Sequence, residues 1–244
     1  MSLWPQGYSR QVHDELDSTN EEARRLALAG EAGPVWVMAR RQRAGRGRRG
    51  RAWQTEEGNL AATLLLSPNV PQAVSGQLSF AAALAVAEMA EYFVPTSNIT
   101  VKWPNDVLAE GRKLAGILLE GASAKPGTNW LAIGIGVNLA GHPEGTEFPA
   151  TSLADLGIAA PPAEEALTIL AARFAHWYDV WMNTGFETLR EAWLARAVAL
   201  GTHIRARLPR ETREGVFAGI DETGALLLNE GGRISAIAAG EVFF

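Results

Sequence analysis

The sequence predicts an α+β fold, in which a mixed sheet flanked by helices forms a large first domain and a small β-barrel follows it. Segments with helical and with strand-like periodicity intermingle up to about residue 198, whereas short alternating strands with tight turns follow from Thr202. The chain has 244 residues, 47% of them hydrophobic, which is enough for one large core and a small second one. We therefore divide it into residues 1–199 and residues 200–244.

Composition excludes several classes of protein. The formal net charge of -5 argues against general nucleic-acid binding. The chain has no cysteine, which excludes disulfides and thiolate chemistry, and its four histidines are scattered and fit no zinc motif. No signal peptide is indicated and no run approaches the ~18 uninterrupted apolar residues of a membrane span, so we expect a cytoplasmic protein with no membrane partner.

The first predicted helix follows the stretch Ser18-Thr19-Asn20-Glu21-Glu22 and ends at Gly30. Ser18 with Glu21, or Thr19 with Glu22, has the spacing of a capping box, in which each side chain satisfies a free backbone N–H at the helix start. On this stretch alone, a helix cap without any ligand is as good an interpretation as a binding site.

Arginine and glycine are concentrated at residues 40–51, between predicted strands at residues 35–39 and 59–66. Glycine lets the backbone approach a ligand closely, and arginine offers a planar fork of donors to carboxylate or phosphate, so the segment predicts an anion-binding loop. Gly45, Gly47 and Gly50 also have the spacing of a dinucleotide-binding fingerprint. We reject that function because residues 52–58 show no helical period and lead into a strand. Polyanion binding without chemistry remains an alternative.

The remaining elements follow from periodicity and turn residues. Helical periodicity predicts three more helices, at residues 73–94, 163–182 and 187–198, with aromatic side chains that we assign to the core. Strands are expected in the large domain at residues 99–103, 113–120 and 130–139, the last two forming a hairpin with a turn at 123–128. In the small domain, strands are expected at residues 204–208, 213–220, 225–229 and 233–236, with a hairpin turn at 221–224.

Three further stretches place polar residues at the ends of predicted strands: Lys102-Trp103-Pro104-Asn105-Asp106, Lys113 with Gly116, and Gly134-x-Gly136-x-Asn138. Each has a plain structural interpretation, as a turn with a buried Trp, a solvated lysine or a piece of core. Glycine within a strand, however, weakens the strand if its only role is to fill the core, and it lets a ligand or another backbone come close. The three stretches are weak separately, and their joint appearance favours one binding site.

Taken together, five motifs closely resemble those of biotin-protein ligase, the enzyme family also called holocarboxylase synthetase. They are Ser18-Thr19-Asn20, Gln42-x-x-Gly45-Arg46-Gly47-Arg48-Arg49-Gly50-Arg51-x-Trp53, Lys102-Trp103-Pro104-Asn105-Asp106, Lys113-Leu114-Ala115-Gly116-Ile117-Leu118-x-Glu120 and Gly134-x-Gly136-x-Asn138. The resemblance covers nearly the whole chain and includes residues 219–228. It implies a catalytic domain of the class II synthetase and biotin-lipoate ligase type, followed by an SH3-like barrel.

The resemblance implies an ATP-dependent ligase that turns biotin and MgATP into biotinyl-5'-AMP and pyrophosphate, then transfers biotin to a lysine of the biotin carboxyl carrier protein of acetyl-CoA carboxylase. The implied catalytic residues are Lys113, Arg48 and Asp106, with Lys113 by the reacting carboxylate and α-phosphate and Asp106 near the carrier lysine or the metal. Implied biotin contacts are Ser18, Thr19, Asn20, Gln42, Gly45, Arg46, Gly116 and Asn138. Implied nucleotide contacts are Arg48, Arg49, Arg51, Trp53, Lys102, Asn105, Lys113 and Asn138. Mg2+ is expected on the nucleotide phosphates, with no direct protein ligand.

Some members of the family carry an N-terminal helix-turn-helix domain and act as repressors. Here the chain opens almost directly on the helix after Ser18, so we expect no DNA binding, while a homodimer remains an option. Two alternative functions stay open. One is the related lipoate ligase or octanoyl transferase family, and the other is a non-catalytic nucleic-acid-binding module with steeply salt-dependent affinity and no consumption of ATP.

Overall fold

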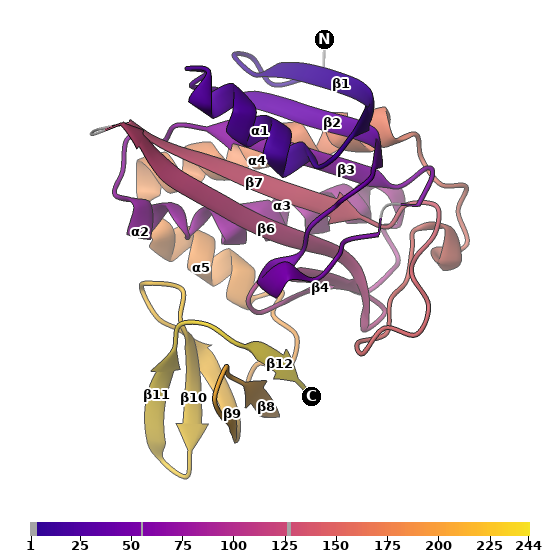
Figure 1. The fold of residues 1–244 in the computed structure, drawn as a ribbon. Helices are drawn as coiled ribbons and strands as arrows, with labels where there is room; N and C mark the ends of the chain where they lie inside the picture. Colours follow the sequence, from indigo (N-terminus) through magenta and orange to yellow (C-terminus); the bar gives the residue numbers. More distant parts are fainter. Residues whose placement is uncertain (1–3, 55, 126–127) are drawn as a thin grey trace.

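A computed structural model describes residues 4–54, 56–125 and 128–244 of the chain. The large domain is built on a seven-stranded sheet in the order β1-β2-β3-β7-β6-β5-β4 (Figure 1). β1 runs parallel to β2 and the other neighbouring pairs are antiparallel, so the predicted mixed sheet is confirmed. Its strands are β1 (Ser9–Leu16), β2 (Val35–Gln42), β3 (Leu60–Leu66), β4 (Ile99–Lys102), β5 (Asp106–Ala109), β6 (Arg112–Lys125) and β7 (Thr128–Val137).

Helices cover both faces of this sheet. The α1 helix (Thr19–Leu28) lies alone on one face, where Ala23 and Ala27 pack against Leu65 and Trp130 (Figure 1). The opposite face is covered by α3 (Leu78–Phe93), α4 (Ala163–Thr184) and α5 (Phe186–Leu194), which close the main core. Short helical turns occur at α2 (Gln72–Ser75), η1 (Arg48–Gly50) and η2 (Ala154–Leu156).

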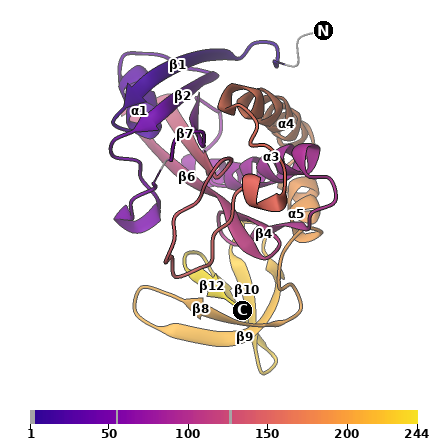
Figure 2. The ribbon, with the colours of Figure 1, turned by 90° about the vertical axis from the view of Figure 1, so that its right-hand side faces the viewer.

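The C-terminal part is a separate five-stranded antiparallel sheet in the order β11-β10-β9-β8-β12, as expected for an SH3-like fold. Its strands are β8 (His203–Arg207), β9 (Thr212–Ile220), β10 (Leu226–Glu230), β11 (Arg233–Ile237) and β12 (Glu241–Phe243). In two views it lies at one end of the large domain, next to β4 (Figures 1 and 2). The exact border at residue 199 stays a prediction.

The predicted hairpin turn at residues 221–224 joins the small domain to the large one through hydrogen bonds and packing. Trp103 Nε1 donates a hydrogen bond to the Gly224 carbonyl at 3.0 Å, and Gln77 Nε2 donates to the Glu222 carbonyl at 3.1 Å. Gly224 has a φ of +87°, and a Cβ there would lie 2.7 Å from Phe80 Cε2. Only glycine therefore gives this turn both its backbone conformation and its close approach.

Several elements differ from the sequence expectations. Strands β1, β5 and β12 were not expected, because their short, half-exposed patterns carry little hydrophobic periodicity. The expected helix at 73–94 is broken into α2 and α3, since backbone bonds from Gln77 to Val74 and from Ser79 to Gly76 span three residues instead of four. Residues 126–127 of the expected hairpin turn lie outside the described residues.

One segment has the length and apolarity of a membrane span. An 18-residue window within residues 72–93 has a mean hydropathy of 1.4, and 67% of that window is buried. Leu84, Val86 and Met89 of this segment belong to the core beneath the sheet, and Leu84 and Met89 are completely covered. Packing against the sheet therefore accounts for its apolar character.

Removing a large aromatic side chain from this core should be costly. Trp193 on α5 is 1% exposed and packs edge-on against Phe80, with 5.3 Å between ring centroids. We expect Trp193→Ala to lower the free energy of unfolding by about 3–5 kcal/mol, because it leaves a cavity that the core cannot close. The control, Met182→Ala, removes a 52% exposed side chain and should cost within about 0.5 kcal/mol. Urea denaturation followed by circular dichroism measures both, and equal losses would contradict this packing.

Candidate active site

A cavity of about 420 Å³ lies between the sheet, the arginine-rich loop, the segment after β7 and strand β12. It collects nearly all the residues singled out from sequence. These are Ser18, Thr19, Asn20, Gln42, Arg46, Arg48, Arg51, Trp53, Lys102, Asn105, Asp106, Lys113, Gly116 and Asn138. Two predicted residues, Gly45 and Arg49, do not line it. Motifs separated by more than 100 residues in the chain therefore meet around one space.

One end of the cavity is a polar pocket at the start of α1. The Thr19 backbone N–H donates to Gln42 Oε1 at 2.8 Å, and Thr19 Oγ1 lies 3.1 Å from the same oxygen. Thr63 Oγ1 donates to Asn20 Oδ1 at 2.6 Å, and Asn20 Nδ2 donates to Glu120 Oε2 at 2.8 Å. Ser18, Thr19 and Asn20 are each at most 5% exposed. The pocket is thus held in place by hydrogen bonds from three strands.

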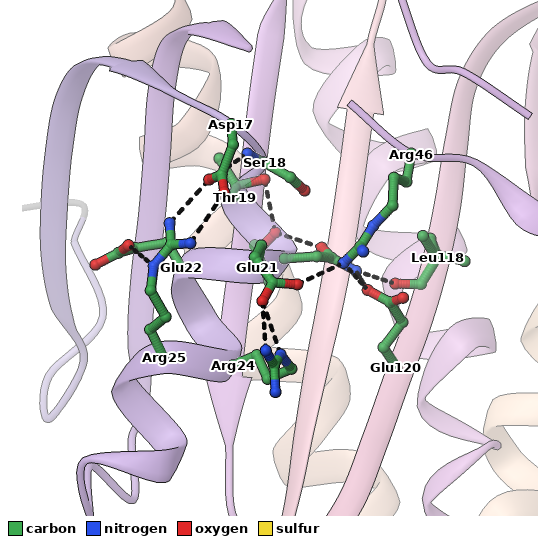
Figure 3. Close-up of polar contacts among 12 residues, drawn as sticks. Asp17, Ser18, Thr19, Glu21, Glu22, Arg24, Arg25, Arg46, Leu118 and Glu120 are labelled. Atoms are coloured by element: carbon green, nitrogen blue, oxygen red, sulfur yellow. Dashed lines mark hydrogen bonds and ion pairs between the residues drawn. The ribbon is translucent and has the colours of Figure 1, made fainter. Parts of the chain in front are cut away.

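These contacts correct the expected capping box. Ser18 is the N-cap residue of α1, but its side chain makes no capping hydrogen bond. Gln42, from the end of β2, satisfies the Thr19 N–H instead. Glu21 and Glu22 turn outward to Arg24 and Arg25, and Figure 3 shows Arg46 between Glu21 and Glu120. The helix start is therefore held by its tertiary neighbours, which leaves Ser18 facing the cavity.

Glycines form the floor of the cavity. Gly116 on β6 and Gly136 on β7 are direct partners in the sheet, and the indole of Trp53 lies against both. A Cβ on Gly136 would be 2.2 Å from Trp53 Cε2, and one on Gly134 would be 2.1 Å from Asn20 Oδ1. The glycine spacing on β7 is therefore explained by two side chains that rest directly on the strand.

The other end of the cavity is rich in positive charge. Lys113 Nζ lies 2.7 Å from Asp106 Oδ1, and both side chains are mostly shielded from solvent. Arg48 Nη1 donates to Asn105 Oδ1 at 3.2 Å and to the Gly240 carbonyl at 3.4 Å. Burial lowers the pKa of Arg48, and the nearby charge of Arg49 lowers it further. These contacts hold both cations in position within the cavity.

The loop that carries the arginines is itself folded. Arg46 pairs with Ala52, the Gly47 N–H donates to the Arg51 carbonyl at 2.7 Å, and the Trp53 N–H donates to the Gly45 carbonyl at 2.9 Å. Gly45 has a structural role, since a Cβ there would lie 2.5 Å from the Trp53 carbonyl oxygen. A single turn at η1 follows, so the structure has no long helix at these glycines.

Glu241 of β12 is a functional neighbour that sequence reasoning missed. It forms ion pairs with Arg49 at 3.7 Å, with Arg207 at 2.5 Å and with Arg51. Burial alone would raise the pKa of Glu241, but the hydrogen bond from Arg207 and the charges of the three arginines outweigh it and hold the pKa below its usual value. Arg51 and Arg49 are thereby tied to the small domain.

Thr63 and Glu120 were also missed. Glu120 lay within a quoted motif, where its position two residues after Leu118 places it on the same strand face, and this was an available signal. Thr63 had none, because a single threonine in an apolar strand does not reveal which residue it will face. Asn138 was predicted, and it is 2% exposed with Nδ2 donating to the Thr151 carbonyl at 3.0 Å. Its Oδ1 accepts no hydrogen bond from the described residues.

The arrangement is suited to a substrate with a polar head and an anionic end. The polar pocket offers donors and acceptors, the glycine floor with Trp53 offers an apolar passage, and Lys113 with Arg48 offers charge for a carboxylate or phosphate. Within the described ranges, no group of three or more His, Cys, Asp or Glu side chains could hold a metal ion.

Two family profiles match the chain. Residues 14–138 match the biotin/lipoate A/B protein ligase family, and residues 199–244 match the biotin protein ligase C-terminal domain. A biotin–[acetyl-CoA-carboxylase] ligase of Paracoccus denitrificans is 46% identical over 235 residues, which cover 93% of this chain and 97% of that protein. A Mycobacterium tuberculosis enzyme with the same name is 37% identical over 93% of this chain and 86% of its own length.

Solved structures agree with these sequence matches. Biotin protein ligase from Aquifex aeolicus, in complex with biotin and ATP, superposes with a TM-score of 0.83 at 27% identity. The superposition covers 96% of this chain and 97% of the Aquifex chain. Both domains of the present structure therefore have counterparts in one known molecule.

The hydroxyl of Thr63 should matter for stability, unlike that of another threonine in the same sheet. Thr63 is fully buried and bonded to Asn20, whereas Thr100 Oγ1 is buried with no partner among the described residues. We expect Thr63→Val to lower the free energy of unfolding by about 1–3 kcal/mol because it leaves Asn20 unsatisfied. Thr100→Val should be neutral or stabilising, because it removes an unpaired polar atom. Chemical denaturation measures the free energy of unfolding of both variants, and similar values would contradict the assigned hydrogen bonds.

Proposed function

Because the chain belongs to the biotin/lipoate A/B protein ligase family, we propose that its cavity activates biotin with ATP and then passes biotin to a lysine of a biotin carboxyl carrier protein. The chain is a ligase that uses ATP to attach biotin. The observation that carries the site assignment is the junction of a hydrogen-bonded pocket and a cation cluster across one glycine floor. A substrate with a polar ring at one end and a carboxylate at the other fits this order.

We assign the polar head of biotin to the pocket at the start of α1. Ser18, Thr19 and Asn20 offer hydroxyl and amide groups there, and Gln42 and Glu120 hold these side chains from the neighbouring strands. The aliphatic part of biotin would lie along Gly116 and Gly136, against Trp53, and its carboxylate would reach Lys113. Gly45 supports this end indirectly, since it lets Trp53 and Gln42 approach the loop.

In the first step, a carboxylate oxygen of biotin attacks the α-phosphorus of ATP. The bond from that phosphorus to the bridging oxygen breaks, pyrophosphate leaves with the electron pair, and biotinyl-5'-AMP remains. Carboxylate and phosphate repel each other, so fixed cations must offset this repulsion and stabilise the transferring group. Lys113 and Arg48 supply that charge, and Asp106 at 2.7 Å keeps the Lys113 ammonium oriented, whereas Arg46 is paired with Glu21 and Glu120 beside the polar pocket. Arg51, Lys102 and Asn105 are assigned to the nucleotide.

In the second step, the neutral amine of the carrier lysine attacks the carbonyl carbon of the mixed anhydride. The bond from that carbon to the AMP oxygen breaks, AMP leaves, and the new amide nitrogen loses a proton. Asp106 lies at the edge of the cation cluster, where it can orient the incoming lysine. Asn138, with its free Oδ1, is assigned to the region between biotin and the ribose.

Magnesium is assigned to the substrate MgATP. Among the carboxylates that line the cavity, Asp106 is engaged by Lys113, and Glu147 and Glu241 are engaged by arginines, so we assign the nucleotide phosphates as the main ligands. Bound there, Mg2+ neutralises phosphate charge. The homodimer and the cytoplasmic location stay predictions.

Biotin-dependent exchange of labelled pyrophosphate into ATP tests the first step. We expect the purified protein to catalyse exchange with biotin, and to give no signal above background with lipoate or octanoate. The hydrogen-bonding pocket is the basis of this expectation, because acids without a polar hydrogen-bonding head would leave its buried polar groups unpaired. Exchange with lipoate but not biotin would assign the site to the related ligases, and no exchange with any acid would overturn the proposed reaction.

Lys113 should be essential for chemistry and dispensable for folding. Lys113→Ala removes a charge from the reacting centre, so we expect biotinyl-5'-AMP formation to fall by at least about 100-fold. The melting temperature should change little, since Lys113 is an edge-of-cavity residue with a 27% exposed side chain. Arg112→Ala is the matched control, because Arg112 is the adjacent cation on β6 and does not line the cavity. Single-turnover assays, with the adenylate quantified by chromatography, compare the two variants. Near-normal adenylate formation by Lys113→Ala would remove Lys113 from the mechanism.

A further inference from the structure

Three aromatic rings surround the ammonium group of Lys102. Its Nζ lies 3.5 Å from the ring centroid of Phe148, 5.5 Å from that of Phe243 and 5.7 Å from that of Phe244. Phe148 comes from the segment after β7, whereas Phe243 and Phe244 end the chain. Rings from two distant segments thus enclose one cation, and none of the three was expected to take part in the site.

Lys102 is buried without a counter-ion. Its residue is 6% exposed, and within the described part of the chain its Nζ makes no hydrogen bond and no ion pair. Asp106 is its direct partner in the β4–β5 register, but the Asp106 carboxylate is engaged with Lys113. A buried ammonium is costly unless it is compensated, and aromatic faces attract a cation by only about 0.5–2 kcal/mol. Lys102 therefore keeps most of its capacity to bind an anion that enters the cavity it lines.

The rings are held in place from behind. β12 pairs antiparallel with β8, and the Phe243 ring lies 4.7 Å from the Arg207 guanidinium and 5.4 Å from that of Arg205. Phe244 packs edge-on against Phe148, with 5.8 Å between centroids. Glu241, two residues before Phe243, binds the arginine-rich loop. The end of the chain is thereby fixed to both domains at the mouth of the cavity.

We propose that Phe148, Phe243 and Phe244 form an aromatic cage that positions the Lys102 ammonium for the triphosphate of ATP, so that the last strand of the small domain completes the nucleotide site. The proposal rests on the proposed ligase function and assigns these three phenylalanines as positioning residues. A carboxylate partner would hold Lys102 equally well but would cancel its charge. Aromatic rings hold the ammonium and leave its charge available to phosphate oxygens.

The cage gives nucleotide use a particular dependence on pH. Burial lowers the pKa of Lys102 to about 8, and of the charged groups facing it, Lys113 lowers the pKa further while Asp106, Glu241 and Glu147 raise it. Lys102 is therefore a cation below about pH 8 and becomes neutral above it. kcat/KM for ATP reports ionisations of the enzyme before the nucleotide binds, so it should fall as pH rises through this value.

Pyrophosphate exchange at saturating biotin, from about pH 6.5 to about pH 9.5, measures that profile. For Phe148→Leu/Phe243→Leu we expect kcat/KM for ATP to fall about tenfold near neutral pH, with biotin affinity unchanged. Leucine keeps Lys102 buried but removes the attraction of the ring faces for the charged form, so the alkaline decline should move to lower pH. In Lys102→Arg the decline should disappear, because guanidinium stays protonated across the range. Tyr92→Leu, on a 55% exposed aromatic residue of α3, is the control and should match the wild type.

Two results would overturn the cage: a double leucine variant with the wild-type profile, or a Lys102→Arg variant that keeps the alkaline decline. A merely structural role for the rings would change melting temperature without moving the decline. Calorimetric titration with the magnesium complex of α,β-methylene ATP, which cannot react, tests the cage without turnover. Weaker binding by the double variant, with an alkaline decline that lies at lower pH than in the wild type, supports the cage even if the protein shows no exchange with biotin, whereas equal binding by wild type and double variant contradicts it.

Discussion

The concentration of positive charge in one cavity is the constraint on which the rest of the structure depends. Arg46, Arg48, Arg51, Lys102 and Lys113 all line it, in a chain whose formal net charge is -5. Like charges at such density repel one another, so the fold must hold them without neutralising them completely. Carboxylates hold Lys113, Arg46 and Arg51, whereas a side-chain amide contacts Arg48 and aromatic rings surround Lys102. The small domain supplies part of this support through Glu241 and Phe243.

A second constraint is that a substrate must lie directly on the sheet, and the glycines make this possible. Gly116, Gly134 and Gly136 weaken their strands, since glycine packs nothing and loses more backbone freedom on folding. In return, Asn20 and Trp53 rest on the backbone at distances that any Cβ would forbid. The polar pocket, the floor and the cation cluster therefore lie in one line along β6 and β7. A reaction that joins a carboxylate to a phosphate needs this order of surfaces.

Particular residues show which parts of the fold and of the site could be predicted from the sequence. Lys113, Asn138 and Ser18 were assigned through the resemblance of their motifs to biotin-protein ligase, whereas their places at strand ends and at a helix start were each weak signals by themselves. The mixed sheet and the C-terminal antiparallel sheet followed from periodicity. Gln42 capping α1, Thr63 bonding Asn20 and Glu241 binding three arginines were not accessible in the same way, because each depends on strand register between distant segments. The phenylalanines around Lys102 were hidden for the same reason, since Phe243 ends a three-residue strand that carries no periodic signal and Phe244 follows it.

The most direct test of this account is a single-turnover experiment with enzyme in excess over labelled ATP, saturating biotin and Mg2+, followed by addition of a biotin carboxyl carrier domain. The account predicts that label accumulates as biotinyl-5'-AMP bound to the protein, and that the carrier then discharges it, leaving AMP in solution and biotin on one carrier lysine. Release of AMP without an adenylate, or an adenylate that the carrier cannot discharge, would contradict the proposal that one cavity serves both steps.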